Sequence, residues 1–242
     1  MSCPTKHRPG LRWPLAMALA IPLALVSCAS GPLPPDWQIN AHVALDRAVA
    51  AYLAGDARVA DAEFERAQRE LSRTGRADLL ARAVLLRCAA QVASLAQGPC
   101  TGFEPYRADA PPAERAYAAY LAGQAGQAGQ ASPADSALLP PAQQAVALAA
   151  AGAAADAALA AISDPVSRLV AAGVLLQTGR ASPATITLAT ETASAQGWRR
   201  PLLAWLGLQA QRAEAAGASD EAARVRRRIA WVQGTAGGAA RP

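Results

Sequence analysis

Apolar residues recur at helical spacing along most of the chain, in segments separated by short polar or glycine-containing breaks. This spacing of three and four residues predicts helices over residues 39–54, 56–74, 76–96, 113–122, 141–161, 164–178, 182–196, 198–216 and 219–232. The segment 141–161 is interrupted at Gly152. Runs of β-branched or aromatic residues with period two are absent, so the sequence predicts an all-α fold.

Residues that begin and end helices stand at the breaks. Gly55 follows the first apolar segment, and glycine at this place adopts the left-handed conformation that closes a helix. Asp56, Asp164 and Ser182 stand where helices begin, because their side-chain oxygens accept hydrogen bonds from free backbone N–H groups. A proline follows each of the last two, as is typical of a first helical turn.

A nine-residue segment occurs twice. Residues 47–55 are echoed by residues 115–123, and the offset of 68 residues is twice the 34-residue period of the tetratricopeptide (TPR) repeat. The first copy, with the segment after it, resembles a TPR helix pair in its small residues, its turn and its aromatic residue, which are Ala48, Gly55, Asp56, Ala60, Phe64 and Ala67. The resemblance implies a TPR-like α-solenoid of antiparallel helical hairpins. Ser72 departs from the usual proline, and an alanine-rich helical bundle with coincidental spacing remains the alternative.

Glycine, glutamine and alanine alternate over residues 123–130, and prolines follow near residue 140. Such a segment offers little apolar surface for packing. We therefore predict a low-complexity linker over 123–140 between helical regions at 39–122 and 141–233. The tail 234–242 is predicted to be disordered.

The N-terminus has the pattern of an export signal. Lys6, Arg8 and Arg12 precede the apolar stretch 13–26, whose 14 residues are too few for a transmembrane helix of about 20 residues. Leu25-Val26-Ser27-Cys28 then resembles the bacterial lipobox. The resemblance implies that residues 1–27 are removed, that Cys28 carries diacylglycerol and usually an acyl group such as palmitate on its amino group, and that residues 28–38 are a tether. Two or more acyl chains anchor a protein stably to a membrane.

The residues after Cys28 bear on location. Ala29 and Ser30 follow it, without an aspartate at the second position. For many lipoproteins this pattern implies the periplasmic side of the outer membrane, and the inner membrane remains the alternative. Removal of residues 1–27 leaves 20 arginines against 18 acidic residues, so the net charge is about +2 and no nucleic acid partner is expected.

The remaining cysteines are an even pair. Cys3 leaves with the signal and Cys28 is expected to be lipidated, which leaves Cys88 and Cys100. In an oxidising compartment we expect a disulfide between them, and two free thiols are the alternative.

Candidate chemistry is sparse. The processed chain keeps one histidine, His42, and shows no zinc-ligand spacing, nucleophile elbow or phosphate-binding loop. We therefore expect no enzyme, cofactor or metal. Trp198 and Trp205 are seven residues apart on one predicted helix, beside Arg199 and Arg200. These four residues either pack the terminal helices or form a partner-binding anchor.

These features together predict a lipid-anchored helical-repeat module that binds another protein, in envelope assembly, secretion or pilus biogenesis. One alternative is a lipoprotein that binds a small ligand or a glycan such as peptidoglycan. The other is an enzyme with an unrecognised site.

Overall fold

The computed structural model describes residues 33–96, 98–124 and 131–234. The export signal, Cys28 and the tail 235–242 lie outside the described residues, as do residues 125–130. Over the described ranges the chain is helical and has no β-strand, which confirms the all-α prediction. The contacts divide the chain into Met1–Leu33 and a compact unit from Pro34 onward, and the description below concerns the second.

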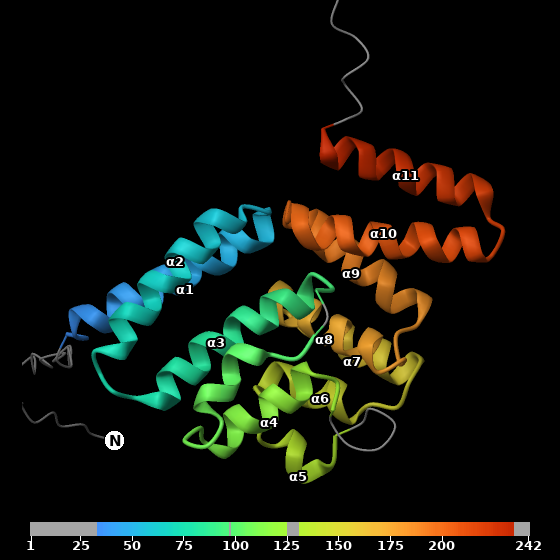
Figure 1. The fold of residues 1–242 in the computed structure, drawn as a ribbon. Helices are drawn as coiled ribbons and strands as arrows, with labels where there is room; N and C mark the ends of the chain where they lie inside the picture. Colours follow the sequence, from blue (N-terminus) through green and yellow to red (C-terminus); the bar gives the residue numbers. More distant parts are fainter. Residues whose placement is uncertain (1–32, 97, 125–130, 235–242) are drawn as a thin grey trace, which may run out of the picture. The chain divides into compact units, whose positions relative to one another are not determined.

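The described helices follow one another with short connections (Figure 1). In chain order they are α1 (Asp36–Ala54), α2 (Ala57–Ser72), α3 (Ala77–Ala93), the 3₁₀ helix η1 (Thr101–Tyr106), α4 (Pro112–Leu121), α5 (Pro133–Ser136), α6 (Pro141–Leu148), α7 (Ala153–Ala160), α8 (Pro165–Gln177), α9 (Pro183–Ala195), α10 (Arg199–Ala215) and α11 (Ser219–Gln233). No predicted segment corresponds to η1 or α5, and the bounds of the other helices agree with the predicted segments to within about three residues, with 141–161 divided into α6 and α7.

The predicted start and stop residues act as caps. The side chain of Asp56 accepts a hydrogen bond from Val59 N, and the Asp164 side chain accepts one from Ser167 N. Ser182 caps α9 in the same way. Gly55 ends α1 with a φ of 100°. A side chain in this left-handed conformation would be strained, which explains why glycine stands there.

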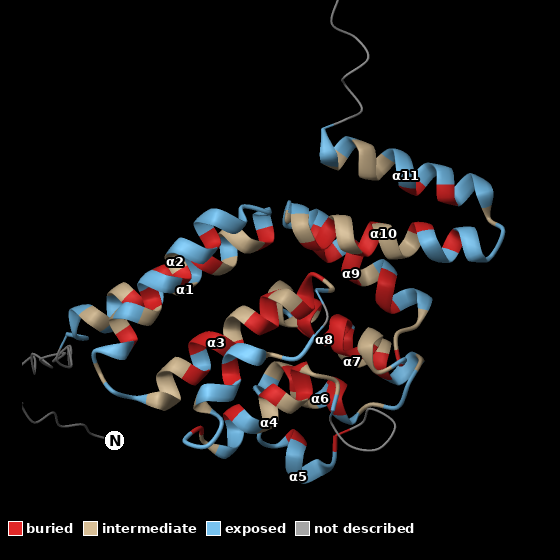
Figure 2. Ribbon diagram, in the orientation of Figure 1, coloured by how far each residue is buried: buried red, intermediate tan, exposed pale blue. Residues whose placement is uncertain are grey.

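The helices pack as neighbouring pairs around α3. The hairpin α1/α2 and the hairpin α10/α11 each pack along their own length, and α3 packs against α4, η1 and α8. Helices α8, α9 and α10 pack in succession, and α10 also contacts α1. Buried residues are frequent in α3 and α8, whereas α11 has few (Figure 2).

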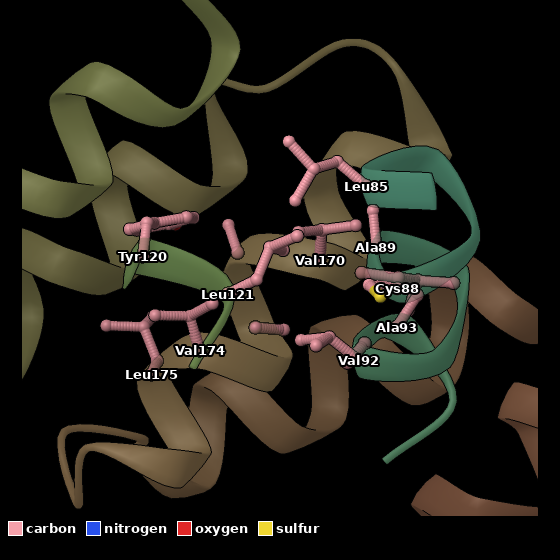
Figure 3. Close-up of a cluster of buried hydrophobic side chains, with 14 of the residues drawn as sticks. Leu85, Cys88, Ala89, Val92, Ala93, Tyr120, Leu121, Val170, Val174 and Leu175 are labelled. Carbon is pink, nitrogen blue, oxygen red and sulfur yellow. The ribbon is translucent and has the colours of Figure 1, made fainter. Parts of the chain in front are cut away.

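The centre of the core lies between α3, α4 and α8 (Figure 3). Val92 and Ala93 from α3 lie there with Leu121 from α4 and Val170 and Val174 from α8, all of them buried. Most of these side chains are small or medium-sized, so the helix axes can approach closely. Close backbone contact therefore contributes to the core, together with the buried aromatic side chains of Phe103, Tyr120 and Trp205.

The segment predicted to be a linker is packed in its second half. Ala131 and Leu139 are buried, α5 lies between them, and Ala131 N donates to Ala147 O at 3.1 Å. The low-complexity pattern ends before residue 131, where apolar residues return, so the prediction was wrong for residues 131–140.

The regular hairpin series is interrupted after α3. Displacing α2 by 34 residues would give a helix over 91–106, where the structure has the end of α3, a loop and η1. Contacts between α3 and α8 and between α1 and α10 join helices far apart in the sequence. Among the described helices, none is both long enough and apolar enough to cross a membrane.

Candidate functional site

The TPR-like signature residues build the α1/α2 hairpin. The side chains of Ala48, Ala60, Phe64 and Ala67 are all buried. The Arg87 guanidinium of α3 lies over the Phe64 ring, 4.8 Å from its centroid. These residues hold α1, α2 and α3 together and leave little surface for a partner.

Trp205 was predicted to be either a core residue or a partner-binding anchor, and the structure gives it the first role. Its side chain is 0% exposed, and its indole Nε1 donates to Ala93 O at 3.1 Å. This carbonyl belongs to the last residue of α3 and lacks a partner within the helix. A partner cannot reach Trp205 in the folded protein.

The other three residues of that prediction have separate environments. Arg200 donates from Nε to Tyr52 O at 2.7 Å, and its guanidinium lies 4.3 Å from the centroid of the Tyr52 ring. Arg200 therefore joins α10 to the end of α1. Arg199 is exposed, and Trp198 is half-buried. The four residues do not form one continuous surface.

The predicted disulfide pair is brought together. Cys88 of α3 and Cys100 of the following loop are bonded, with Cα atoms 5.8 Å apart. The bond fixes the loop that leads into η1 against the helix from which it emerges.

The strongest candidate for a binding site is a pair of adjoining cavities along α3. One has a volume of about 420 Å³ and the other about 360 Å³. Leu86 and Tyr117 line both. We call the two cavities together the α3 groove. Each falls in the size range of about 300–1,000 Å³ that is typical of ligand sites.

The walls of the α3 groove come from six parts of the chain. They include Val49 and Leu53 of α1, Leu85 and Leu86 of α3, Tyr117 of α4, Leu138 and Leu139 after α5, Val166 and Val170 of α8, and Trp198 before α10. Leu138 is 41% exposed although it is apolar. The surface is therefore mainly apolar and open to solvent.

The charged groups of the α3 groove are mostly acidic. Asp46, Glu114 and Asp164 supply three carboxylates, against one guanidinium from Arg82. The whole chain has a formal net charge of +5. The groove therefore has the opposite sign to the chain as a whole.

Glu114 is the most buried of these acids. It is 6% exposed, and its Oε1 accepts one hydrogen bond from Arg82 Nε at 2.5 Å. Its Oε2 is buried and has no hydrogen-bond partner among the described residues. A buried carboxylate oxygen that lacks a donor is costly, so its presence at a cavity wall indicates a place for an incoming donor.

Tyr117 stands one helical turn beyond Glu114. Burial raises the pKa of its hydroxyl above the ordinary value of 10.0, so this group stays neutral and can donate a hydrogen bond. Its ring stacks with that of Tyr120, with centroids 6.2 Å apart. Tyr120 in turn donates to Gln143 Oε1 at 2.9 Å, and Gln143 Nε2 donates to Ser167 O at 3.0 Å. This network joins α4, α6 and α8 and holds Tyr117 in place.

No pattern in the sequence predicted the α3 groove. Glu114 and Tyr117 share a face of a predicted helix, but an acid and a tyrosine at this spacing are common on solvated helices. Glu114 and Tyr117 differ from such pairs because α3, α8 and residues 138–140 cover them, and no local sequence pattern predicts this burial.

The one histidine of the predicted processed chain does not line the α3 groove, although it lies beside one of the groove's acids. His42 is exposed on α1, with its Nε2 3.4 Å from Asp46 Oδ2. Within residues 33–96, 98–124 and 131–234, no three His, Cys, Asp or Glu side chains are grouped so that they could hold a metal ion.

Comparison with known proteins supplies no relative from which a function could be transferred. The chain matches no protein-family model, no curated protein and no solved structure.

Proposed function

We propose that this protein is a lipid-anchored, TPR-like helical module that holds a segment of a partner protein in the α3 groove, on the periplasmic side of the outer membrane. The observation that carries the proposal is the groove itself, an apolar surface open to solvent and formed by six parts of the chain. Exposed apolar surface of this kind is characteristic of interaction sites.

The TPR-like part of the proposal is supported by the α1/α2 hairpin. Its small residues and Phe64 are buried between the helices, as the repeat pattern requires. TPR arrays present their inner helices to a bound segment. Helices α1 and α3, which precede and follow α2 and would be inner helices in such an array, both line the α3 groove.

The binding proposal is tested by site-specific photo-crosslinking in the native membrane. A photoreactive phenylalanine derivative replaces Tyr117, and the same derivative at Glu191 is the control because that residue is exposed on α9. We expect a discrete adduct with one protein from position 117 and none from position 191. Leu86→Arg should abolish the adduct, since it places a charge in the groove. A chain that forms no adduct at position 117, or an adduct that survives Leu86→Arg, would contradict the proposal.

The anchor is tested separately. Mass spectrometry of the N-terminal peptide should find Cys28 as the first residue, carrying diacylglycerol and an amide-linked acyl chain. Cys28→Ala should lose the modification. An unmodified Cys28 in the wild-type protein would refute the anchor without affecting the groove.

A further inference from the structure

We infer that the segment held in the α3 groove carries a cationic side chain, lysine or arginine, between apolar residues, and that this cation binds Glu114. The inference rests on the proposed function, since it names the chemistry of the partner segment. Three observations support it, and each concerns a different property of the groove.

The first observation is the incomplete pairing of Glu114. Some arginine–carboxylate pairs in the described residues are two-pronged, and others, such as Arg87 with Asp61, have a single hydrogen bond at an exposed site. Arg107 donates from Nε and Nη2 to the two oxygens of Glu104, at 2.8 and 2.7 Å. Arg82 donates only from Nε to Glu114 Oε1, so Glu114 Oε2 keeps its acceptor capacity while buried at the cavity wall.

The second observation is the sign of the charge. A guest in the α3 groove meets the carboxylates of Asp46, Glu114 and Asp164 and the single guanidinium of Arg82. The Arg82 side chain is 62% exposed, so water screens it more than it screens Glu114. A cation is therefore attracted to the groove and an anion is repelled.

The third observation is the apolar surface around Glu114. Leu85, Leu139 and Pro140 line the same cavity. Lysine and arginine have aliphatic stems that pack on apolar surface while the charged end reaches a carboxylate. The Tyr117 hydroxyl, which is neutral and has no hydrogen-bond partner among the described residues, offers a second polar contact. The cavity therefore suits a long cationic side chain better than a free inorganic cation.

Three blocked peptides that differ at one position test the inference. Each has two leucines on either side of a central lysine, glutamine or glutamate, and acetyl and amide groups remove the terminal charges. They are titrated by NMR into the full lipidated chain, held in nanodiscs of zwitterionic lipid. We expect the lysine peptide to bind at least about tenfold more tightly than the glutamine peptide, as suits a charge-assisted bond, and the glutamate peptide to bind most weakly.

The variants assign the preference to Glu114. Glu114→Gln should reduce the lysine preference to about twofold or less, while the glutamine peptide binds as before. Glu104→Gln is the matched control, because it also removes an arginine-paired carboxylate but at an exposed site. Circular dichroism melting of both variants shows whether they are folded. Tyr117→Phe provides a further variant, which keeps the charge of the groove unchanged.

The outcomes separate the two proposals. Equal binding of the lysine and glutamine peptides, or a lysine preference that persists in Glu114→Gln, overturns the cationic guest and leaves the groove a binding site. Binding that Leu86→Arg does not weaken overturns the groove as the site. Failure of all three peptides to bind overturns the inference, while the crosslinking experiment still tests the proposed function on its own.

Discussion

Gly173 of α8 lies so close to the main chain of α3 that a Cβ atom on it would stand 2.4 Å from the Val92 carbonyl oxygen. The obstacle is backbone within a helix and cannot rotate away. The glycine therefore sets the distance at which the two central helices pack.

Gly173→Ala should lower the free energy of unfolding by about 1–3 kcal/mol, because the added methyl group forces α8 away from α3. Gly207→Ala is the matched control, since Gly207 lies inside α10 and its added Cβ would meet nothing within 4 Å. That change should stabilise the protein by about 0.5–1 kcal/mol through helix propensity. Urea denaturation measures both, and stabilisation by Gly173→Ala would contradict the packing.

Trp205→Phe should destabilise the protein by about 2–3 kcal/mol. The change removes the bond from the indole to Ala93 O, at the end of α3, and leaves a void in the core. Trp231 is 64% exposed, so Trp231→Phe should change the stability by less than about 0.5 kcal/mol. Thermal melts compare the two variants, and similar small effects would indicate that Trp205 is not a structural residue.

Reduction of the Cys88–Cys100 disulfide should lower the stability by about 3 kcal/mol, because the bond closes a short loop in the unfolded chain. Urea denaturation with and without dithiothreitol measures the difference. A chain with Cys88→Ala and Cys100→Ser should be insensitive to the reductant. Thiol labelling of the untreated, unfolded protein should find no free thiol at Cys88 or Cys100, and a reactive thiol at either position would show that the bond is absent.

Alkaline solution should destabilise the protein through Tyr120. Burial raises the pKa of its hydroxyl, so the folded protein retains the proton at pH values where the unfolded chain, with a pKa of about 10, releases it. Stability is therefore fully present below pH 10 and is lost as the pH rises above it, by up to roughly 1.4 kcal/mol per pH unit.

Tyr120→Phe tests this dependence. It removes the hydrogen bond to Gln143, so at pH 8 the variant should be less stable by about 1–2 kcal/mol. Above pH 10 its stability should decline less steeply than that of the wild type. Urea denaturation between pH 9 and pH 11 measures the slopes, and equal slopes would mean that Tyr120 does not carry the effect.

The helices could be predicted from the sequence because their signals are local. Gly55 ends α1, and Asp56, Asp164 and Ser182 cap the helices that follow them, as the sequence indicated. These contacts join residues within one helical turn, so the identity of a few neighbours decides them. The pairing of Cys88 with Cys100 was predicted for a different reason, since they are the two cysteines that remain once Cys3 and Cys28 are assigned to the expected export signal.

The long-range packing could not be read in this way. The sequence predicted a linker over 123–140, yet Leu139 is buried and lines the α3 groove. It left two roles open for Trp205, and the choice depended on a carbonyl 112 residues away.

By itself the sequence determined most of the helices and their caps, because these depend on contacts within a few residues, and the number of its cysteines indicated the pairing of Cys88 with Cys100. Only the tertiary structure decided that Glu114 is a buried acid with a free acceptor, and that Leu86 and Tyr117 line one groove. Burial and electrostatics depend on which distant segments cover a side chain, and alanine-rich helices carry few side chains distinctive enough to specify those partners in advance.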